Sequence, residues 1–282
     1  MFSKITGHSL LAAVLSLYSS SAIYAKSEPD FWQGFYSKRE VGGFLSVGAS
    51  LTYSGGLLSD IETRTHLVIS GNYYFENGLF IEVPGNSNKF EPSWVMGYNL
   101  YNHGNWEFDV IYSSAHAPLN YHVHPKDGSD KDRTAYIGIR ASAALGDYQF
   151  QALVAPKADN SEYNDGVYAS AWIARSWQYK NWHFYGSVGL QYRNSQMLDY
   201  YYGVPEDAVI LAPYEASGGF NSHLKVGFTK PLSASWVLDG TVGITDYASS
   251  IDDSPYSKLA KKYNGNRSEL GRHVSLTLNY VF

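Results

Sequence analysis

The C-terminal stretch of the chain alternates strictly between apolar and polar side chains. Its apolar positions are Val274, Leu276, Leu278 and Tyr280, and its polar positions are His273, Ser275, Thr277 and Asn279. A period of two puts successive side chains on opposite faces, so the pattern predicts a strand with one apolar face. Because the strand stops on the aromatic Phe282, it resembles the signal with which outer-membrane barrels engage the barrel assembly machinery.

Segments with this alternation recur along the chain, about twelve in all, the even number expected of a bacterial barrel. They are 41–53, 65–75, 79–85, 92–101, 105–114, 133–145, 148–155, 166–178, 182–193, 217–229, 234–246 and 272–282. The charge of Lys225 falls on the polar side of its segment, as a face turned away from lipid requires. The sequence thus predicts an all-β protein, a transmembrane antiparallel up-and-down β-barrel over residues 40–282.

The connections between these segments alternate between short and long. The short ones are rich in turn formers and span 76–78, 102–104, 146–147, 179–181 and 230–233. The long ones span 54–64, 86–91, 114–132, 156–165, 194–216 and 247–271, of which 86–91 is the shortest. Outer-membrane barrels have short periplasmic turns and longer outer loops, so the long connections are predicted to be extracellular.

Aromatic residues fall at two kinds of position in the predicted barrel. Those that follow or adjoin a short turn would form the periplasmic aromatic girdle, namely Trp106, Trp182, Trp236, Phe75, Tyr148 and Phe282. Others fall on inward positions, namely Phe44, Tyr74, Phe80, Tyr101, Tyr136 and Tyr185. Bulky inward rings obstruct water, so a narrow or closed lumen is expected, with a diffusion channel for small solutes as the alternative.

The N-terminus carries a different pattern. Lys4 precedes an almost wholly apolar stretch from Leu10 to Leu17, which small residues and Ala25 follow. This pattern predicts a secretory signal peptide over residues 1–25, because its apolar core is far shorter than the roughly 20 residues of a spanning helix. The next segment, 26–39, holds aromatic residues among charges and is predicted to be a periplasmic segment or a lumen plug.

Composition agrees with a barrel and excludes one class of function. The 282 residues include 25 Tyr, 13 Phe and 7 Trp but no Cys, and the mean hydropathy is −0.28. This combination arises when lipid-facing positions alternate with polar lumen positions. The formal net charge of −5 is mild, without the clustered Lys and Arg that nucleic-acid binding needs.

One residue pair has the chemistry of a hydrolase. His273 and Ser275 share a face of the last strand, as in barrels that cleave lipid. A nucleophile and its base need a third group for orientation, and only Glu269, in a loop, is near in sequence. Ordinary lining of the lumen is therefore the favoured interpretation, and the protein is not expected to be an enzyme.

Two loops hold residue types that bind metal ions. Loop 114–132 contains the candidate ligands His116, His122, His124, Asp127, Asp130 and Asp132. Asp246, Asp252 and Asp253 lie in or beside loop 247–271, but their spacing fits no calcium loop. Solvated outer loops explain both groups, so no residue is assigned to a metal, a cofactor or catalysis.

Motifs in the last third of the chain resemble the MipA/OmpV family of outer-membrane proteins. They are Tyr201-Tyr202-Gly203-Val204, Ala212-Pro213-Tyr214-Glu215-Ala216-Ser217-Gly218-Gly219, Lys230-Pro231-Leu232-Ser233-Ala234-Ser235-Trp236, Asp253-Ser254-Pro255 and the Tyr-x-Phe end. Gly42-Gly43 and Tyr53-Ser54-Gly55-Gly56 fit as well, whereas Tyr256 stands where the family usually has an aliphatic residue. The resemblance implies a barrel in the outer membrane of a Gram-negative bacterium.

The resemblance also implies a role in the cell envelope. The family's founding role is that of a scaffold, which holds a murein lytic transglycosylase near a bifunctional penicillin-binding protein, while other members are described as adhesins or stress-linked proteins. The expected function is therefore a scaffold that links the outer membrane, with its lipid and lipopolysaccharide, to peptidoglycan-remodelling enzymes. A narrow channel or a surface adhesin is the alternative, and a lipid hydrolase is the least favoured.

Overall fold

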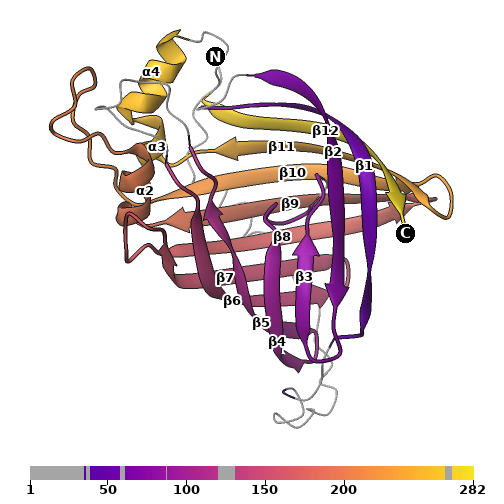
Figure 1. The fold of residues 1–282 in the computed structure, drawn as a ribbon. Coiled ribbons are helices and arrows are strands. Elements are labelled where there is room, and N and C mark those ends of the chain that lie inside the picture. The colour runs from indigo at the N-terminus through magenta and orange to yellow at the C-terminus, as the bar shows by residue number, and fades with distance from the viewer. Residues whose placement is uncertain (1–34, 36–38, 58–60, 87, 120–130, 264–268) are drawn as a thin grey trace, which may run out of the picture.

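Twelve antiparallel strands form a closed barrel in the computed structural model, which describes residues 35, 39–57, 61–86, 88–119, 131–263 and 269–282 (Figure 1). The strands are β1 (Gly42–Gly55), β2 (Glu62–Tyr74), β3 (Leu79–Val83), β4 (Val95–His103), β5 (Trp106–His116), β6 (Thr134–Leu145), β7 (Tyr148–Asp159), β8 (Tyr168–Tyr179), β9 (Trp182–Arg193), β10 (Gly219–Pro231), β11 (Trp236–Asp246) and β12 (Leu270–Val281). Each pairs with its neighbour in the chain, and β12 closes the barrel against β1. The predicted fold class is confirmed, and every predicted segment overlaps one strand.

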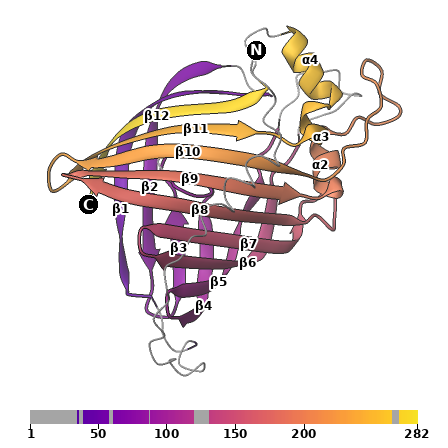
Figure 2. The ribbon, with the colours of Figure 1, turned by 180° about the vertical axis from the view of Figure 1, so that it is seen from behind.

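The barrel wall twists strongly along the strand order. Seen from both sides, β6 to β11 run across the view while β1 to β4 run steeply past them (Figure 1, Figure 2). Right-handed twist accumulates from strand to strand because each strand favours it sterically. The result is a lumen walled by strands that lie far apart in the sequence.

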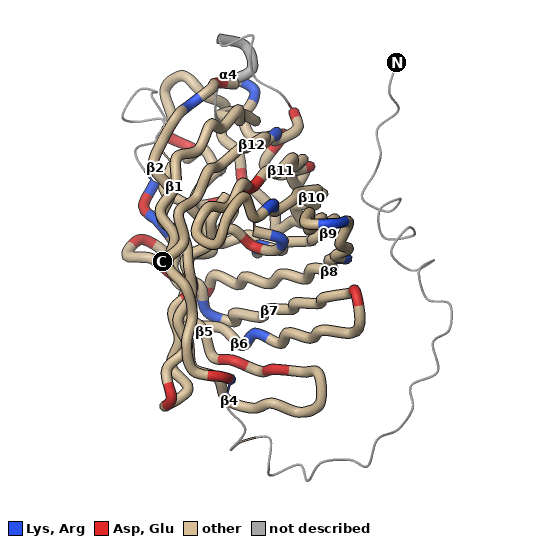
Figure 3. The backbone as a smooth tube through the Cα atoms, turned by 90° about the vertical axis from the view of Figure 1, so that its right-hand side faces the viewer, with Lys and Arg blue, Asp and Glu red and all other residues tan. Residues whose placement is uncertain are grey.

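The alternation predicted from the sequence sorts side chains between the lumen and the outside. In β9, Tyr185, Ser187 and Gln191 are buried on the inner face. On the outer face large apolar residues are exposed, such as Leu67 at 80% and Ile137 at 64%. Figure 3 shows that most strands run for long stretches without a charged residue. An apolar belt of this kind on a closed antiparallel barrel faces lipid.

The two ends of the barrel differ. Helices α2 (Ser195–Tyr202), α3 (Ser249–Asp252) and α4 (Pro255–Tyr263) lie in the long connections at one end, and the C-terminus lies at the opposite end (Figure 1). At the latter end Trp236 packs edge-on against Tyr280, with ring centroids 5.3 Å apart, as the predicted girdle requires. We assign the end with the helices to the cell exterior, because long loops face outward in such barrels. No described helix is long and apolar enough to cross a membrane.

The predicted position of one connection, 86–91, is wrong. β3 has only five residues, and the chain then turns inward at Pro84-Gly85 instead of rising to the outer rim. Proline has no N–H to donate to a strand ladder, so the strand ends there. The described residues of the stretch predicted as an outer loop, 86–91, therefore belong to a segment inside the barrel, which we call the lumen segment (residues 84–86 and 88–94).

A bulge overturns one inward assignment. The pairing between β4 and β5 shifts between Asn99 and Tyr101, so Tyr101 pairs with Phe108 rather than with Glu107. Asp109 is inward and fully buried, which places Phe108 and Tyr101 on the opposite face. The extra residue of a bulge reverses the alternation beyond it. Phe80, Tyr136 and Tyr185 are buried inward as predicted.

The predicted N-terminal segments lie mostly outside the described residues. The signal peptide 1–25 lies there entirely, and of the segment 26–39 only Phe35 and Arg39 are described. Both assignments stay predictions. Arg39, however, reaches charged groups inside the barrel.

Two substitutions on β6 test which face meets lipid. Ile139 is 58% exposed on the outer face, and Ser142 lines an internal cavity where its cross-strand partner is Glu107. Ile139→Lys should lower the free energy of unfolding in lipid bilayers by about 2–4 kcal/mol, the cost of a basic residue at mid-bilayer. Ser142→Lys should change it by less than about 1 kcal/mol. Equal losses in denaturant titrations would contradict the assigned faces.

Single cysteines test the orientation of the barrel, since the natural chain has none. Cysteines at Ser161 and Asp207, in long connections, should react with a membrane-impermeant maleimide in intact cells. Cysteines at Asn77 and Asn181, in short turns, should react only after the outer membrane is permeabilised. The reverse pattern would show that the barrel is inserted the other way round.

Candidate functional site

The lumen segment crosses the interior of the barrel and is bound to strands on several sides. Asn86 donates a 2.7 Å hydrogen bond to Ser50 Oγ of β1, and Lys89 Nζ donates to Gln149 of β7 and Ser176 of β8 at 3.1 and 3.0 Å. Lys225 of β10 donates to the carbonyl oxygen of Phe90. The segment is therefore a fixed part of the lumen rather than a surface loop.

Glu91 is the most heavily bonded residue of the lumen segment. Its carboxylate accepts hydrogen bonds from Tyr168 Oη and from Ser170 Oγ of β8, and from Gln191 Nε2 of β9 at 3.2 Å. Burial raises the pKa of Glu91 to about 7, although Arg193 and the Ser170 hydroxyl pull that pKa down. A buried carboxylate without such donors would be costly, so these bonds hold the segment in place.

The lumen segment separates two cavities. The outer cavity, toward the helices, has a volume of about 690 Å³, and the inner cavity, toward the short turns, has about 950 Å³. Several residues of the segment line both cavities, namely Pro84, Gly85, Asn88, Glu91 and Ser93. Each cavity is large enough for a small organic molecule. The lumen segment thus takes up part of the lumen and lies between these two cavities.

A network of buried charges lies beside the inner cavity. Arg140 of β6 donates two hydrogen bonds to Glu82 of β3, at 2.6 and 3.1 Å, and one to Asp109 of β5 at 3.0 Å. Arg39 donates to Asp109 at 3.0 Å and to Glu107 of β5 at 2.7 Å. Bidentate pairing of this kind offsets the cost of removing the charges from water. The network ties the short β3 to β5 and β6.

Aromatic rings complete this network. The guanidinium carbons of Arg39 and Arg140 lie 5.0 and 5.1 Å from the centroid of the Phe80 ring. Tyr74 Oη donates a 3.0 Å hydrogen bond to Glu82. Cations over an aromatic face gain further electrostatic stabilisation where water is excluded. We infer that these contacts hold β3 between β2 and β4 although β3 has only five residues.

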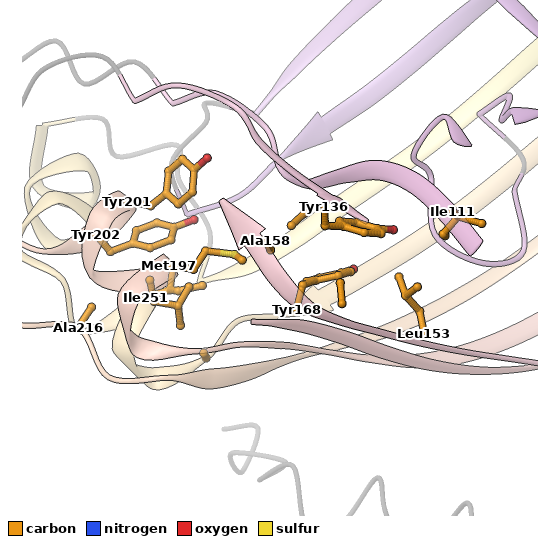
Figure 4. Packing of buried hydrophobic residues seen from close by; sticks show 14 of the residues in the cluster. Ile111, Tyr136, Leu153, Ala158, Tyr168, Met197, Tyr201, Tyr202, Ala216 and Ile251 are labelled. Carbon is orange, nitrogen blue, oxygen red and sulfur yellow. The ribbon is translucent and has the colours of Figure 1, made fainter. Parts of the chain in front are cut away.

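The outer end of the lumen is covered by packed loop residues. Figure 4 shows Met197, Tyr201 and Tyr202 of α2 beside Ile251 of α3, in the same cluster as residues of the barrel wall. α2 starts at Asn194, whose side chain accepts a hydrogen bond from the backbone N–H of Met197. Its tyrosine rings then lie over the lumen. The helices therefore narrow the outer mouth of the barrel, and the lumen segment narrows the barrel inside.

His116 belongs to this packing and not to an open metal site. Its ring stacks on Tyr201 at 3.7 Å, its Nε2 lies 3.0 Å from Tyr202 Oη, and its Nδ1 lies 2.6 Å from the carbonyl oxygen of Ala117. Both ring nitrogens are thus engaged by the protein. The other candidate ligands of this loop, His122, His124, Asp127 and Asp130, lie outside the described residues, and Asp132 is described.

The structure does not assemble the remaining predicted chemistry among the described residues. His273 and Ser275 both face the lumen, but no hydrogen bond joins them, since positions two apart on a strand lie roughly 7 Å from each other. Asp253 pairs with Lys258 at 3.2 Å. No group of three or more metal-binding side chains occurs in the described ranges.

Sequence reasoning missed the charge network, although a signal was present. Glu82, Asp109 and Arg140 each stand within a predicted strand, and a charge at membrane depth is tolerated only when it faces the interior. The same rule places Lys225 in the lumen. It could have placed all these charges in the lumen, but not paired them, because pairing depends on the register between strands.

The closed barrel, its lipid-facing belt and its polar lumen define an outer-membrane β-barrel protein. Residues 45–280 match the family described as MltA-interacting protein MipA. The chain therefore belongs to the MipA family, and its localisation is the outer membrane of a Gram-negative bacterium. This confirms the resemblance seen in the sequence.

Comparison with other proteins adds only distant likenesses. A search of curated protein sequences gave no significant match. Among solved structures the chain is similar to OmpT, an outer-membrane protein of Vibrio cholerae, with 7% identity, a TM-score of 0.41 and coverage of 86% of this chain and 99% of that chain. It is also similar to an anion-selective porin from Comamonas acidovorans, with 9% identity, a TM-score of 0.31 and coverage of 86% and 99%. Likeness at this level says nothing about what this barrel binds.

Removal of one guanidinium tests the charge network. Arg140→Met leaves Glu82 and Asp109 with fewer partners in a buried site, so the free energy of unfolding should fall by about 3–5 kcal/mol. Arg175→Met is the matched control, because Arg175 and Asp147 form an exposed pair 3.8 Å apart, worth no more than about 1 kcal/mol. Denaturant titration in lipid vesicles measures both. Similar losses in the two variants would contradict a stabilising network.

Proposed function

We propose that this barrel is a non-enzymatic scaffold that holds a peptidoglycan-remodelling enzyme at the periplasmic face of the outer membrane. The observation that carries the proposal is the lumen segment, which lies across the interior and is bonded to opposite walls. In a barrel built this way, the segment in the lumen makes the barrel rigid and does not leave a wide passage. The family description, an MltA-interacting protein, supports a lytic transglycosylase as the partner.

The periplasmic surface available to such a partner consists of the short turns and the segment 26–39. The turns include exposed cations and rings, for example Lys180, whose Nζ lies 5.5 Å from the Tyr179 ring centroid. Trp182 and Lys230 lie close by, with Nζ 4.4 Å from the ring centroid. Aromatic and cationic residues are common anchors in protein interfaces.

Partner capture and its location can be tested with the full chain. Tagged protein from detergent extracts should retain a murein lytic transglycosylase, detected by its activity on peptidoglycan. A short epitope inserted at Asn181, in a turn, should abolish capture, because it blocks the periplasmic face. The same insertion at Asp207, in a long connection, is the control and should leave capture intact. Capture that survives the first insertion and fails with the second would refute the periplasmic location.

A narrow channel is the second candidate, because the two cavities are separated by one segment only. The scaffold proposal expects little steady conductance from the purified barrel in planar bilayers. Lys225→Met removes the donor that holds the Phe90 carbonyl oxygen and should raise conductance without loss of partner capture. A large, solute-selective current in the unmodified protein, with no enzyme retained, would favour the channel instead.

A further inference from the structure

In the described part of the chain, the barrel wall is incomplete toward the end that carries the helices. β3 ends at Val83 and β4 starts at Val95, so neither strand continues between β2 and β5 above this level. β2 itself continues from Ser70 to Glu62, where it pairs with β1 but with no other strand in the described part of the chain. Strands lie about 4.8 Å apart, so two absent strands leave β2 and β5 roughly 14 Å apart.

Two inward-facing residues of β2 are exposed, which agrees with an opening in the wall beside this strand. Arg64 and His66 of β2 face inward, opposite Thr52 and Ser50 of β1. Those partners are 7% and 1% exposed, as lumen residues usually are. In contrast, the Arg64 side chain is 70% exposed and His66 is also exposed. The lumen is therefore accessible from the side at β2.

The opening adjoins the outer cavity. Pro84 and Gly85 line this cavity below the opening, and Trp94 and Ser114 line it on the side of β5. Gly85 lies so close to Ser70 of β2 that an added Cβ would meet the serine side chain at 3.1 Å. The lumen segment thus forms the lower edge of the opening, and the 690 Å³ cavity lies behind it.

The edges of the opening are suited to an amphiphilic molecule. Leu67 and Ile69 are exposed on the outer face of β2, and across the opening Trp94 packs edge-on against Tyr112, with centroids 5.5 Å apart. These residues suit an acyl chain. A strand edge in hydrocarbon leaves backbone polar groups without water, which is unfavourable unless something polar also reaches it.

Three arginines lie at the rim of this opening and of the outer cavity behind it. Arg64 stands on the free edge of β2, where it forms an exposed ion pair with Glu62, and the exposed residues Arg133 and Arg272 line the outer cavity. Deeper in the cavity, Lys225 and Arg193 donate to neutral carbonyl oxygens. Arginine binds phosphate through paired hydrogen bonds, so this rim is complementary to a phosphorylated head group.

We propose that the opening between β2 and β5, together with the outer cavity, is a binding site for a phosphorylated glycolipid of the outer leaflet, lipopolysaccharide. An acyl chain lies between β2 and the pair Trp94 and Tyr112, and phosphates lie on the arginine rim. The site is independent of the proposed scaffold role, because it lies at the opposite end of the barrel from the short turns.

Photo-cross-linking in native outer membranes tests whether lipid reaches the inward side of β2. A benzophenone amino acid at position 66 should form a covalent adduct with lipopolysaccharide, as should the same residue at the outward Leu67, the positive control. At Ser142, an inward position in the paired wall, it should form none. Absence of a lipid adduct at position 66 would overturn the proposal. An adduct only with a second copy of the chain would do so too, because the free edge would then be an interface between barrels.

The phosphate contacts are tested by charge removal. Arg64→Gln combined with Arg133→Gln should reduce the adduct at position 66 by roughly tenfold, as expected from the loss of a charge-assisted hydrogen bond. Arg175→Gln, an exposed arginine at the end with the short turns, should leave the adduct unchanged. Purified barrel in vesicles should also bind phosphorylated lipid A more tightly than its dephosphorylated form. Equal binding of the two forms would overturn the assignment of the rim to phosphate.

Discussion

The need to pair every backbone N–H and C=O group inside a bilayer governs this structure. In hydrocarbon no water replaces a missing partner, so the strands form a closed ladder from β1 to β12. The exception among the described strands is the edge of β2 from Ser70 to Glu62, which pairs with β1 alone. The ladder is weakest at β3, where Pro84 ends the strand after five residues. Closure there depends on the few pairs between β2, β3 and β4, and the features of the lumen follow from how the chain accommodates this short strand.

Buried charges compensate for the short strand. Arg140 joins Glu82 of β3 to Asp109 of β5, and Arg39 adds a second guanidinium to the same carboxylate. A buried ion pair need not stabilise a protein relative to apolar packing, but loss of one partner is costly. Here the pairs connect β3 to β5 and β6, two strands with which β3 shares no ladder. Side-chain chemistry thus substitutes for backbone pairing at the place where pairing is scarce.

The two ends of the barrel are built for different surroundings. Short turns with exposed aromatic and cationic side chains face one side, and packed helices with an arginine-rimmed opening face the other. The lumen segment lies between these ends, and Glu91 and Lys225 bind it to the wall. A scaffold for a periplasmic enzyme and a lipid site in the outer leaflet are compatible in one barrel, since they use opposite ends.

The sequence by itself determined the strands, their lipid and lumen faces, the girdle and the family, because period-two alternation and short turns are local properties of the chain. Only the tertiary structure decided what the lumen contains. Glu82, Asp109 and Arg140 are far apart in sequence, and their pairing depends on strand register. A local pattern was also unable to show that the lumen segment turns into the barrel. Nor could it show that a bulge moves the Tyr101 side chain to the outer face. Both outcomes arise from competition between ladder hydrogen bonds and long-range packing, which alternation does not encode.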